Sequence, residues 1–246
     1  MSATPGTPLL KITDLNKSFG GLTVTKELTM SVHEGQFFGV IGPNGAGKST
    51  LFNLISGYIL PDSGKIEFQG RDITGMPPHL VCLQGIGRTF QIVKPFASRT
   101  VLYNVAVGAF ARTSHLHEAQ DRAKKIVHQL GLGKRKDVLA KNLTIVDRKR
   151  LELAKALATQ PNLLLLDEIL AGLTPSEVDE AVHLVRDICA TGVTIVMIEH
   201  VMRAVMALCE NVLVINYGKK IAEGTPAQVT ADPEVISAYL GEEHAT

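Results

Sequence analysis

The sequence has almost no net charge. Its 25 lysines and arginines balance 24 aspartates and glutamates, so the formal net charge is only +1 over 246 residues. Such a chain has no global field that would attract nucleic acid or anionic lipid, and we expect no nucleic-acid partner. It also has no repeat and no low-complexity segment. Its length is sufficient to bury a full core and fits one domain.

Cysteines and long apolar runs are scarce as well. Cys82, Cys189 and Cys209 lack metal-ligand spacing, which is typical of reduced thiols in a cytosolic protein. No apolar run approaches the roughly 20 residues needed to cross a bilayer. Residues 1–8 lack the basic and apolar regions of a signal peptide. We therefore expect a soluble, cytoplasmic chain.

The most informative feature that is present is a glycine-rich loop. It follows the apolar run 36–41, which suits a buried strand, and it precedes residues 48–56, which suit a helix. Strand, loop and helix in this order are the context of a phosphate-binding P-loop. The loop and the start of the helix comprise Gly42, Pro43, Asn44, Gly45, Ala46, Gly47, Lys48, Ser49 and Thr50.

Each residue type in this loop has a physical reason in a nucleotide site. Its glycines permit backbone conformations that a Cβ would bar, so that successive N–H groups converge on phosphates. Lys48 places a positive charge between the β- and γ-phosphates, and Ser49 offers a hydroxyl to Mg²⁺. The N-terminus of the helix adds its dipole. We expect Thr50 to help cap the loop.

Apolar patterning predicts an α/β chain with an inserted helical segment. Short alternating runs before and after the P-loop suggest antiparallel strands, and a helical pattern extends over 100–159, with loops at 131–133 and around Asn142. Beyond it, strands and helices alternate again. The predicted strands are 10–15, 28–32, 36–41, 65–68, 163–166, 193–198 and 212–215.

Two carboxylates follow a run of four leucines. Residues 163–166 read as a strand buried on both faces, whose carboxyl end opens toward a ligand crevice in a parallel sheet. This position predicts Asp167 as a Mg²⁺ ligand. It predicts Glu168 as the residue that orients or deprotonates a water for attack on the γ-phosphate. Without a P-loop in the same chain, the pair would indicate only the start of a solvated loop.

Two further polar residues stand where predicted strands end. His200 follows the apolar run 193–198 and Glu199, where it can bridge the γ-phosphate and the catalytic carboxylate. An isolated histidine here would simply be a polar residue after a strand. Gln91 closes a strand-like stretch at the start of the helical segment, where its amide can contact both Mg²⁺ or its water and that segment.

With these residues in place, the chain resembles the ATP-binding subunits of ABC transporters over essentially its whole length. Residues 42–50 match the Walker A motif, Gln91 the Q-loop, residues 163–168 the Walker B motif with its catalytic glutamate, and His200 the switch histidine. Phe19 falls where the family places an aromatic ring that stacks on adenine. The comparison alone distinguishes Phe19 from an ordinary core ring.

The resemblance implies the fold and the cofactors. We expect one ABC ATPase domain over 1–246, with a RecA-like α/β P-loop core, an antiparallel β subdomain and a helical subdomain inserted at about 93–159. The implied cofactors are ATP and Mg²⁺. Ser49, Gln91 and Asp167 are the expected metal ligands, and Glu168, His200 and Gln91 the expected catalytic residues.

Within the superfamily, the chain looks like the branched-chain amino acid uptake group. The segments whose sequence resembles that of this group are 85–91, 171–175, 198–202, 224–226 and 232–241. Related groups, including lipopolysaccharide-export ATPases, share the Gly-Thr-Pro and Tyr-Leu-Gly endings. Branched-chain amino acids or related small solutes are therefore the expected cargo, with lipopolysaccharide export as the alternative.

The signature motif departs from the family pattern. Leu-Ser-Gly-Gly-Gln aligns with residues 143–147, where Ile145 and Val146 replace both glycines and add bulk. Thr144 and Asp147 resemble a capping box at the start of a helix. We expect them to keep an anion-binding helix end for the ATP of the opposite subunit. Two smaller departures are Ile169, where the family commonly has proline, and Thr174, where many members have aspartate.

The resemblance also implies partners. We expect a homodimer, or a heterodimer with a second ABC ATPase subunit, that drives separate integral membrane permease subunits, with an extracellular solute-binding protein completing the system. The chain would then lie peripherally on the cytoplasmic face of the inner (plasma) membrane. The expected docking surface is apolar and near Gln91, around Val93, Phe96, Val101 and Leu102.

Two rival functions follow from the same residues. A nucleotide-gated dimerisation module with low turnover would explain the altered signature, but intact Glu168 and His200 argue against it. A soluble ABC ATPase that acts on DNA or ribosomes would need coiled-coil insertions or a second cassette. Neither the length nor the charge of this chain favours that rival.

Overall fold

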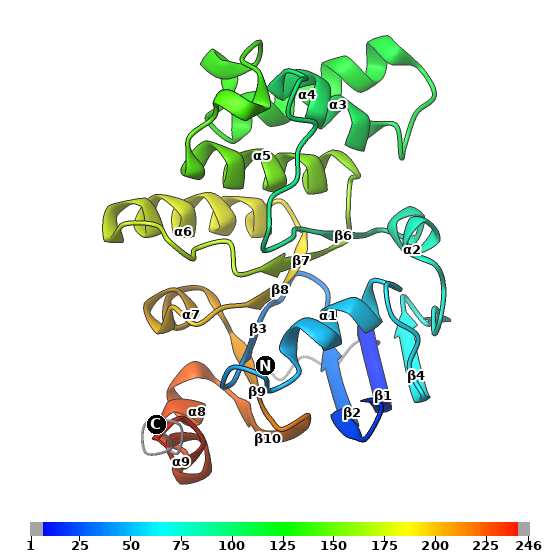
Figure 1. Cartoon of the computed structure of the whole chain (residues 1–246), viewed down its shortest axis with the longest axis vertical. Coiled ribbons are helices and arrows are strands. Elements are labelled where there is room, and N and C mark those ends of the chain that lie inside the picture. The colour runs from blue at the N-terminus through cyan, green and yellow to red at the C-terminus, as the bar shows by residue number, and fades with distance from the viewer. Residues whose placement is uncertain (1–6, 241–246) are drawn as a thin grey trace.

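Two sheets and the helices around them make up the protein, whose structure is a computed structural model that describes residues 7–240 (Figure 1). The first half of this region contains β1 (Leu10–Phe19), β2 (Leu22–Val32), β3 (Phe37–Ile41), α1 (Lys48–Ile55), β4 (Ser63–Phe68), β5 (Arg71–Asp72), α2 (Pro78–Gln84), β6 (Ile86–Arg88), α3 (Val101–Ala109) and α4 (Leu116–Gln129). The second half contains the 3₁₀ turns η1 (Gly133–Arg135) and η2 (Ala140–Asn142), then α5 (Ile145–Ala158), β7 (Leu163–Asp167), α6 (Pro175–Ala190), β8 (Thr194–Ile198), α7 (Met202–Leu208), β9 (Asn211–Asn216), β10 (Lys219–Gly224), α8 (Pro226–Ala231) and α9 (Pro233–Leu240).

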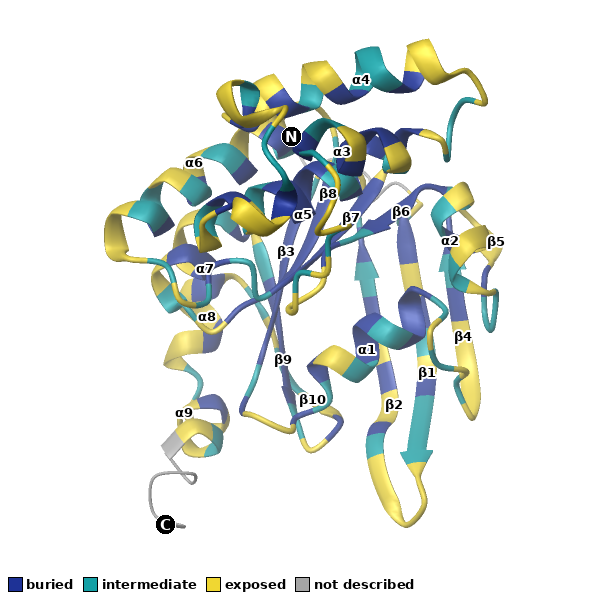
Figure 2. Cartoon of the chain, turned by 45° about the horizontal axis from the view of Figure 1, so that its top comes forward, coloured by how far each residue is buried: buried dark blue, intermediate teal, exposed yellow. Residues whose placement is uncertain are grey.

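The larger sheet has the strand order β10-β9-β3-β8-β7-β6. Five of its strands run parallel, and β10 pairs with β9 in the antiparallel sense. Every residue of β3, β7 and β8 is buried, because helices cover one face of this part of the sheet, and α1 with the smaller sheet covers the other (Figure 2). The parallel order brings the carboxyl ends of these strands to one edge, where the P-loop, Asp167 and Glu199 follow.

The smaller sheet is antiparallel, with the order β2-β1-β4-β5. Strand β1 pairs with both β2 and β4, and the β1–β2 hairpin turns at residues 20–21. Helix α1 packs between this sheet and the parallel one, and its Phe52 shares a buried cluster with Phe38 and Phe68. The expected antiparallel strands are confirmed, although β1 and β2 are longer than the alternating runs that predicted them.

Helices α3, α4 and α5 form a layer at the top of Figure 1, beyond the end of the parallel sheet that carries β6 and β7. The loops expected at 131–133 and around Asn142 lie between α4 and α5, and a further break separates α3 from α4. The expected fold, a P-loop core with an antiparallel β subdomain and a helical insert, is confirmed. The boundaries 93–159 and the assignment of 1–246 to one domain stay predictions.

The sequence did not reveal several short elements. Helix α2 has only seven residues and β5 has two, so neither is long enough to show a hydrophobic period. Strand β6 has three residues and overlaps the strand-like stretch that was expected to end at Gln91. Gly241, the last residue of the resembling tail, lies outside the described residues. Among residues 7–240, no helix has both the length and the apolar content needed to cross a bilayer.

Candidate functional site

The P-loop connects β3 to α1 and needs glycine at two positions for steric reasons. Gly42 has φ +149°, and a Cβ there would lie 2.0 Å from the Ile215 carbonyl oxygen. Gly47 has φ +104°, and its Cβ would lie 2.3 Å from the Val24 carbonyl oxygen. Both clashes are with backbone, which cannot move aside. The loop is therefore held against β9 and β2 in a conformation that only glycine allows.

Lys48 is the first residue of α1, and its ammonium group turns back over the loop. Its Nζ donates hydrogen bonds to the carbonyl oxygens of Gly42 (2.6 Å) and Pro43 (2.8 Å). The charge is therefore held at the loop and at the helix N-terminus, where an anion binds best. The N-cap of α1 is Gly47, without a side-chain cap, and Thr50 lies inside the helix. Our expectation that Thr50 caps the loop was wrong.

Asp167 is the last residue of β7, and it lines one pocket together with Ser49 and Gln91. Its carboxyl group is almost fully buried. Burial raises the pKa of Asp167, and the hydrogen bond and charge of Arg88 partly offset this effect. A carboxylate, a hydroxyl and an amide oxygen are hard ligands of the kind that Mg²⁺ prefers. The three expected metal ligands thus lie around one space, and their set fits the ion.

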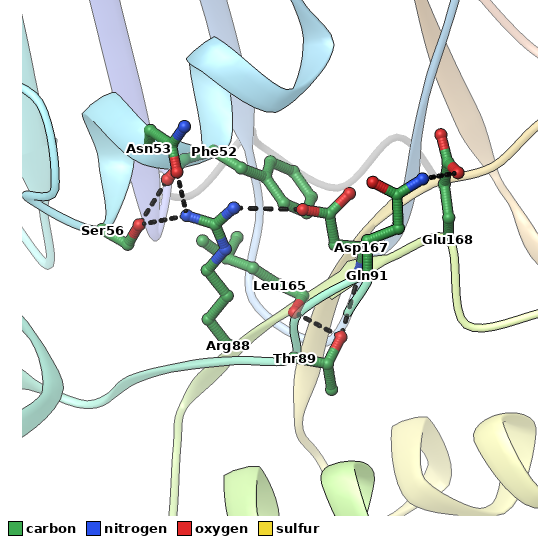
Figure 3. A network of polar contacts seen from close by, with 9 residues as sticks. All are labelled: Phe52, Asn53, Ser56, Arg88, Thr89, Gln91, Leu165, Asp167 and Glu168. Atoms are coloured by element: carbon green, nitrogen blue, oxygen red, sulfur yellow. Dashed lines mark hydrogen bonds and ion pairs between the residues drawn. The ribbon is translucent and has the colours of Figure 1, made fainter. Parts of the chain in front are cut away.

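Glu168 directly follows β7, and its side chain meets the Q-loop. Gln91 Nε2 donates a hydrogen bond to Glu168 Oε2 at 2.7 Å (Figure 3). The backbone of Glu168 has φ +48°, a left-handed conformation that is uncommon outside glycine. Its N–H donates to the Ile198 carbonyl at the end of β8 (3.0 Å), which holds this conformation. Two expected catalytic residues from distant parts of the chain therefore touch.

His200 and Phe19 do not line the pocket that Ser49, Gln91 and Asp167 share. His200 is exposed and lines a different pocket, with Ala171, Gly172 and Arg203. Among residues 7–240, no hydrogen bond joins the His200 side chain to Glu168. Phe19 ends β1 with 48% of its surface exposed, and Lys17 Nζ lies 5.3 Å from its ring centroid. Its ring has the exposure that a stacking platform requires.

Thr144 is the N-cap of α5, as expected, but the capping box is incomplete. The Asp147 N–H donates to Thr144 Oγ1 (3.2 Å), while the Asp147 carboxylate accepts from the Thr144 hydroxyl (2.8 Å) and from Arg135. In a full box the carboxylate would accept the Thr144 backbone N–H instead. Our expectation of a capping box was wrong in this respect, because the carboxylate accepts from the Thr144 hydroxyl and from Arg135 and not from the Thr144 backbone N–H.

The departures from the family pattern have local explanations. Val146 of the signature and Ile169 line the same small pocket, and Lys149 beside them donates to the carbonyl oxygen of Ile169 (3.0 Å). The two changes are thus neighbours in space. Thr174 is the N-cap of α6 and forms a complete capping box with Glu177.

The expected docking surface needs one correction. Val101 is fully buried in the core of the helical insert, and Leu102 is only partly exposed. Phe96 is 52% exposed, as expected. The other large exposed apolar side chains near Gln91 and on the outer side of α3 are Phe90, Ile92, Tyr103, Val107 and Phe110.

Sequence reasoning missed three polar residues next to the site. Arg88 donates a hydrogen bond to Asp167, and Lys149 donates to the backbone carbonyls of Glu168 and Ile169 directly after β7. Glu199 is buried directly after β8. Glu199 Oε1 accepts the Leu170 N–H (2.8 Å). Arg88 lies inside the segment 85–91 that carried the resemblance, but no local pattern marks an arginine as a buried partner of a distant aspartate.

Fold and pocket together define a P-loop nucleotide-binding cassette. The sequence profile of the family described as ABC transporter matches residues 25–171, and that of the branched-chain amino acid ATP-binding cassette transporter matches residues 219–245. Two solved structures share the fold with a TM-score of 0.87. One is a nucleotide-free ATP-binding cassette (30% identity, 95% and 99% of the two chains covered), and the other is a cassette in its ADP conformation (31%, 96% and 100%).

Curated relatives agree with these matches. The high-affinity branched-chain amino acid transport ATP-binding protein LivG of Escherichia coli (strain K12) is 37% identical, and BraF of Pseudomonas aeruginosa is 36% identical, each covering 96% of this chain and 98% of the relative. The lipopolysaccharide export system ATP-binding protein LptB of Acidithiobacillus ferridurans is 34% identical with the same coverage. The chain belongs to the ABC transporter family, as one of its ATP-binding ATPase subunits. The roles assigned to individual site residues stay predictions.

Proposed function

We propose that this chain is the ATP-hydrolysing subunit of a multi-subunit ABC importer for branched-chain amino acids or related small solutes. The observation that carries the hydrolytic part is the convergence of the P-loop, Asp167 and the Gln91–Glu168 pair at one edge of the parallel sheet. The match of residues 219–245 and the LivG and BraF relatives support this choice of cargo over lipopolysaccharide export.

The residues of the pocket divide the chemistry among them. The P-loop amides and Lys48 bind the phosphates of ATP, and Phe19 stacks on the adenine ring. Ser49, Asp167 and Gln91 would hold Mg²⁺, which would supply charge neutralisation at the transferring phosphoryl group. Glu168 accepts a proton from the attacking water, and Gln91 holds its carboxylate in place. His200 bridges the γ-phosphate and the Glu168 carboxylate once ATP is bound.

A second ABC ATPase subunit completes each site. The exposed N-terminus of α5, with Thr144 at its cap, faces the ATP of the opposite protomer and binds it through backbone N–H groups. The partner is an identical or a related subunit. Asp147 supports this contact indirectly, because its carboxylate accepts a hydrogen bond from the Thr144 hydroxyl.

The transporter further contains permease subunits in the membrane, which place this chain on the cytoplasmic face of the inner membrane, and an extracellular solute-binding protein. The permease docks on the exposed apolar side chains around Phe96 and α3, beside the Q-loop. A group of exposed apolar side chains of this kind is typical of a protein–protein contact. Gln91 lies next to this surface and to Glu168, so docking and hydrolysis share one loop.

Uptake by the complete system tests the proposal. We would delete the gene in its host, restore it as wild type or as Glu168→Gln, and measure uptake of radiolabelled leucine, isoleucine and valine. Wild type should restore uptake, and the variant should not. Lipopolysaccharide at the cell surface is measured in the same strains. Normal uptake in the deletion strain with a defect in lipopolysaccharide would overturn the import function and favour export.

A further inference from the structure

Arg88 is a buried cation next to the expected Mg²⁺ ligand. It ends β6, and its side chain is 8% exposed, against 6% for that of Asp167. Arg88 Nη2 lies 3.0 Å from Asp167 Oδ2 (Figure 3). β6 and β7 are parallel neighbours, so the two residues face each other at adjacent strand ends. At this burial, the electrostatic attraction between the two charges is strong, because little water screens it.

The rest of the guanidinium is fixed by α1, the helix that begins with Lys48. Arg88 Nη1 donates to Asn53 Oδ1 (2.7 Å) and to Ser56 Oγ (2.8 Å). The Ser56 hydroxyl in turn donates to the Phe52 carbonyl (2.5 Å). The planar guanidinium is thus held in one orientation by contacts to β7 and to α1. The flexible ammonium group of a lysine would not reproduce this fork of two donor nitrogens.

Aromatic rings enclose the same guanidinium. Its central carbon lies 5.0 to 5.7 Å from the ring centroids of Phe52, Tyr58 and Phe90. Its Nε is buried without a hydrogen-bond partner among residues 7–240. An unpaired buried N–H has a cost, so the arrangement is not one that stability alone would favour. Such exceptions at a polar site point to a role in function.

Two opposite effects of Arg88 on Mg²⁺ must be compared. Its positive charge repels a second cation, yet without it Asp167 would be a buried carboxyl with no cationic hydrogen-bond partner. Arg88 also bonds to Oδ2 only, and the hydrogen bond fixes the direction of Oδ1. We judge this orientation to outweigh the repulsion, because outer-shell partners of metal ligands normally strengthen binding.

We infer that Arg88 is a positioning residue that holds the Asp167 carboxylate in the orientation required for Mg²⁺ binding with ATP. The inference rests on the proposed ATP site and extends it to Arg88, which lines the same pocket as Ser49 and Asp167. Arg88 and Phe90 also line the neighbouring pocket between α2, α3 and α5. The same side chain therefore joins the metal site to the surface beside α3.

The test compares nucleotide affinity with and without Mg²⁺. A fluorescent ATP analogue is titrated into the purified chain in EDTA and in Mg²⁺, and the ratio of the two Kd values measures how much the metal contributes. In Arg88→Met, affinity in EDTA should stay at the wild-type value, because Lys48 and the loop are unchanged. The Mg²⁺ contribution should fall about tenfold, the lower end of the effect of outer-shell substitutions on metal sites.

Two comparisons separate positioning from a structural role. Arg88→Lys keeps a charge but loses the fork, so its ratio should lie between those of wild type and Arg88→Met. Arg112→Met is the matched control. The Arg112 guanidinium donates to the carbonyls of Cys82, Leu83 and Thr159, away from the nucleotide pocket. This control should lose stability but keep the wild-type ratio.

Each outcome decides the inference. An unchanged ratio in folded Arg88→Met, or a larger Mg²⁺ contribution, would overturn it. If that variant does not fold by circular dichroism, Asn53→Ala with Ser56→Ala releases the guanidinium without removing it. The ratio should then fall severalfold, and a wild-type ratio would count equally against the inference. Failure of the wild type to bind the analogue at all would instead overturn the proposed function.

Discussion

Lys48 donates its hydrogen bonds to carbonyl groups of its own loop, at 2.6 and 2.8 Å. An incoming nucleotide exchanges these contacts for charge-assisted bonds to phosphate, each of which contributes about 1.5–3 kcal/mol. The loop thus holds the ammonium group close to the position where the phosphates bind. Little reorganisation of the chain is then required on binding.

Lys48→Ala should weaken ATP binding by at least about tenfold, because one or two such bonds are lost. The fold should survive, since the removed contacts are within one loop. Titration with a fluorescent ATP analogue measures the affinity. Lys124→Ala, on the exposed side of α4, is the control and should bind as wild type does. Binding of both variants at wild-type affinity would refute the P-loop assignment.

Glu199 is a buried carboxyl group whose second oxygen, Oε2, has no hydrogen-bond partner among residues 7–240. Burial raises its pKa above the ordinary value, and the hydrogen bond from Leu170, with the nearby His200, only partly offsets this effect. Glu168 and Lys149 are the other charged neighbours. The folded state therefore binds the Glu199 proton more tightly than the unfolded state does.

The sign of the pH dependence follows from this difference. Below the ordinary pKa, both states are protonated. As the pH rises from there to the raised pKa, the free energy of unfolding falls by about 1.4 kcal/mol per pH unit. Glu199→Gln removes the effect, so its Tm should exceed that of wild type at pH 8 and differ less at pH 5. Thermal unfolding at both values measures this. The exposed Glu210→Gln should show no such gap, and an equal gap at both pH values would contradict the assignment.

At the scale of elements, α5 shows how a local signal and a distant contact combine. Its start was predictable from Thr144, because a threonine before an amphipathic run is typical of an N-cap. The contact with Arg135 was not predictable from the sequence. Arg135 forms an ion pair with the Asp147 carboxylate, the group that would accept the Thr144 backbone N–H in a full capping box. Ile145 is 66% exposed at the first position of the helix, so it adds bulk at the surface and none in the core.

Thr144→Val should destabilise the chain by about 1 kcal/mol, the usual effect of losing an N-cap side chain. Asp147 loses a hydrogen-bond donor at the same time. Urea unfolding measures the free energy, and Thr144→Ser, which keeps the hydroxyl, should be close to wild type. Should valine leave the stability unchanged, the cap would contribute nothing to α5, and its hydroxyl would have to be assigned another role.

For the whole molecule, the proposed function requires two protomers. The P-loop side of one protomer and the α5 cap of the other are both exposed in this chain, as an ATP sandwich requires. Dimer closure should then depend on ATP that is not consumed.

Glu168→Gln should bind ATP but lower turnover at least about 100-fold, the scale of a lost general base. ATP with Mg²⁺ should therefore shift this variant from monomer to dimer in size-exclusion chromatography with light scattering. Adding Lys48→Ala should abolish the shift, and adding Thr144→Val should reduce it while monomer affinity stays unchanged. A dimer that forms equally well without ATP would refute nucleotide-driven closure.

The sequence by itself determined the local parts of the fold and the site. Glycines at 42 and 47 specify the loop through backbone conformation, and the apolar runs at 163–166 and 193–198 specify buried strands, because these effects act between near neighbours. The sequence also shows which residues directly follow each predicted strand. The positions of the P-loop, Asp167 and Glu168 at strand ends were therefore predictable. The elements that it did not reveal are too short to carry a period.

Only the tertiary structure decided which of these parts meet. Gln91 and Glu168 are 77 residues apart, and Arg88 and Asp167 are 79 apart. They touch because the sheet places β6 beside β7, and strand order is a property of the whole packed sheet. The burial of Val101 and the ion pair between Arg135 and Asp147 arise in the same way. Each depends on contacts between distant segments, whose free energy is gained only when the core closes around them.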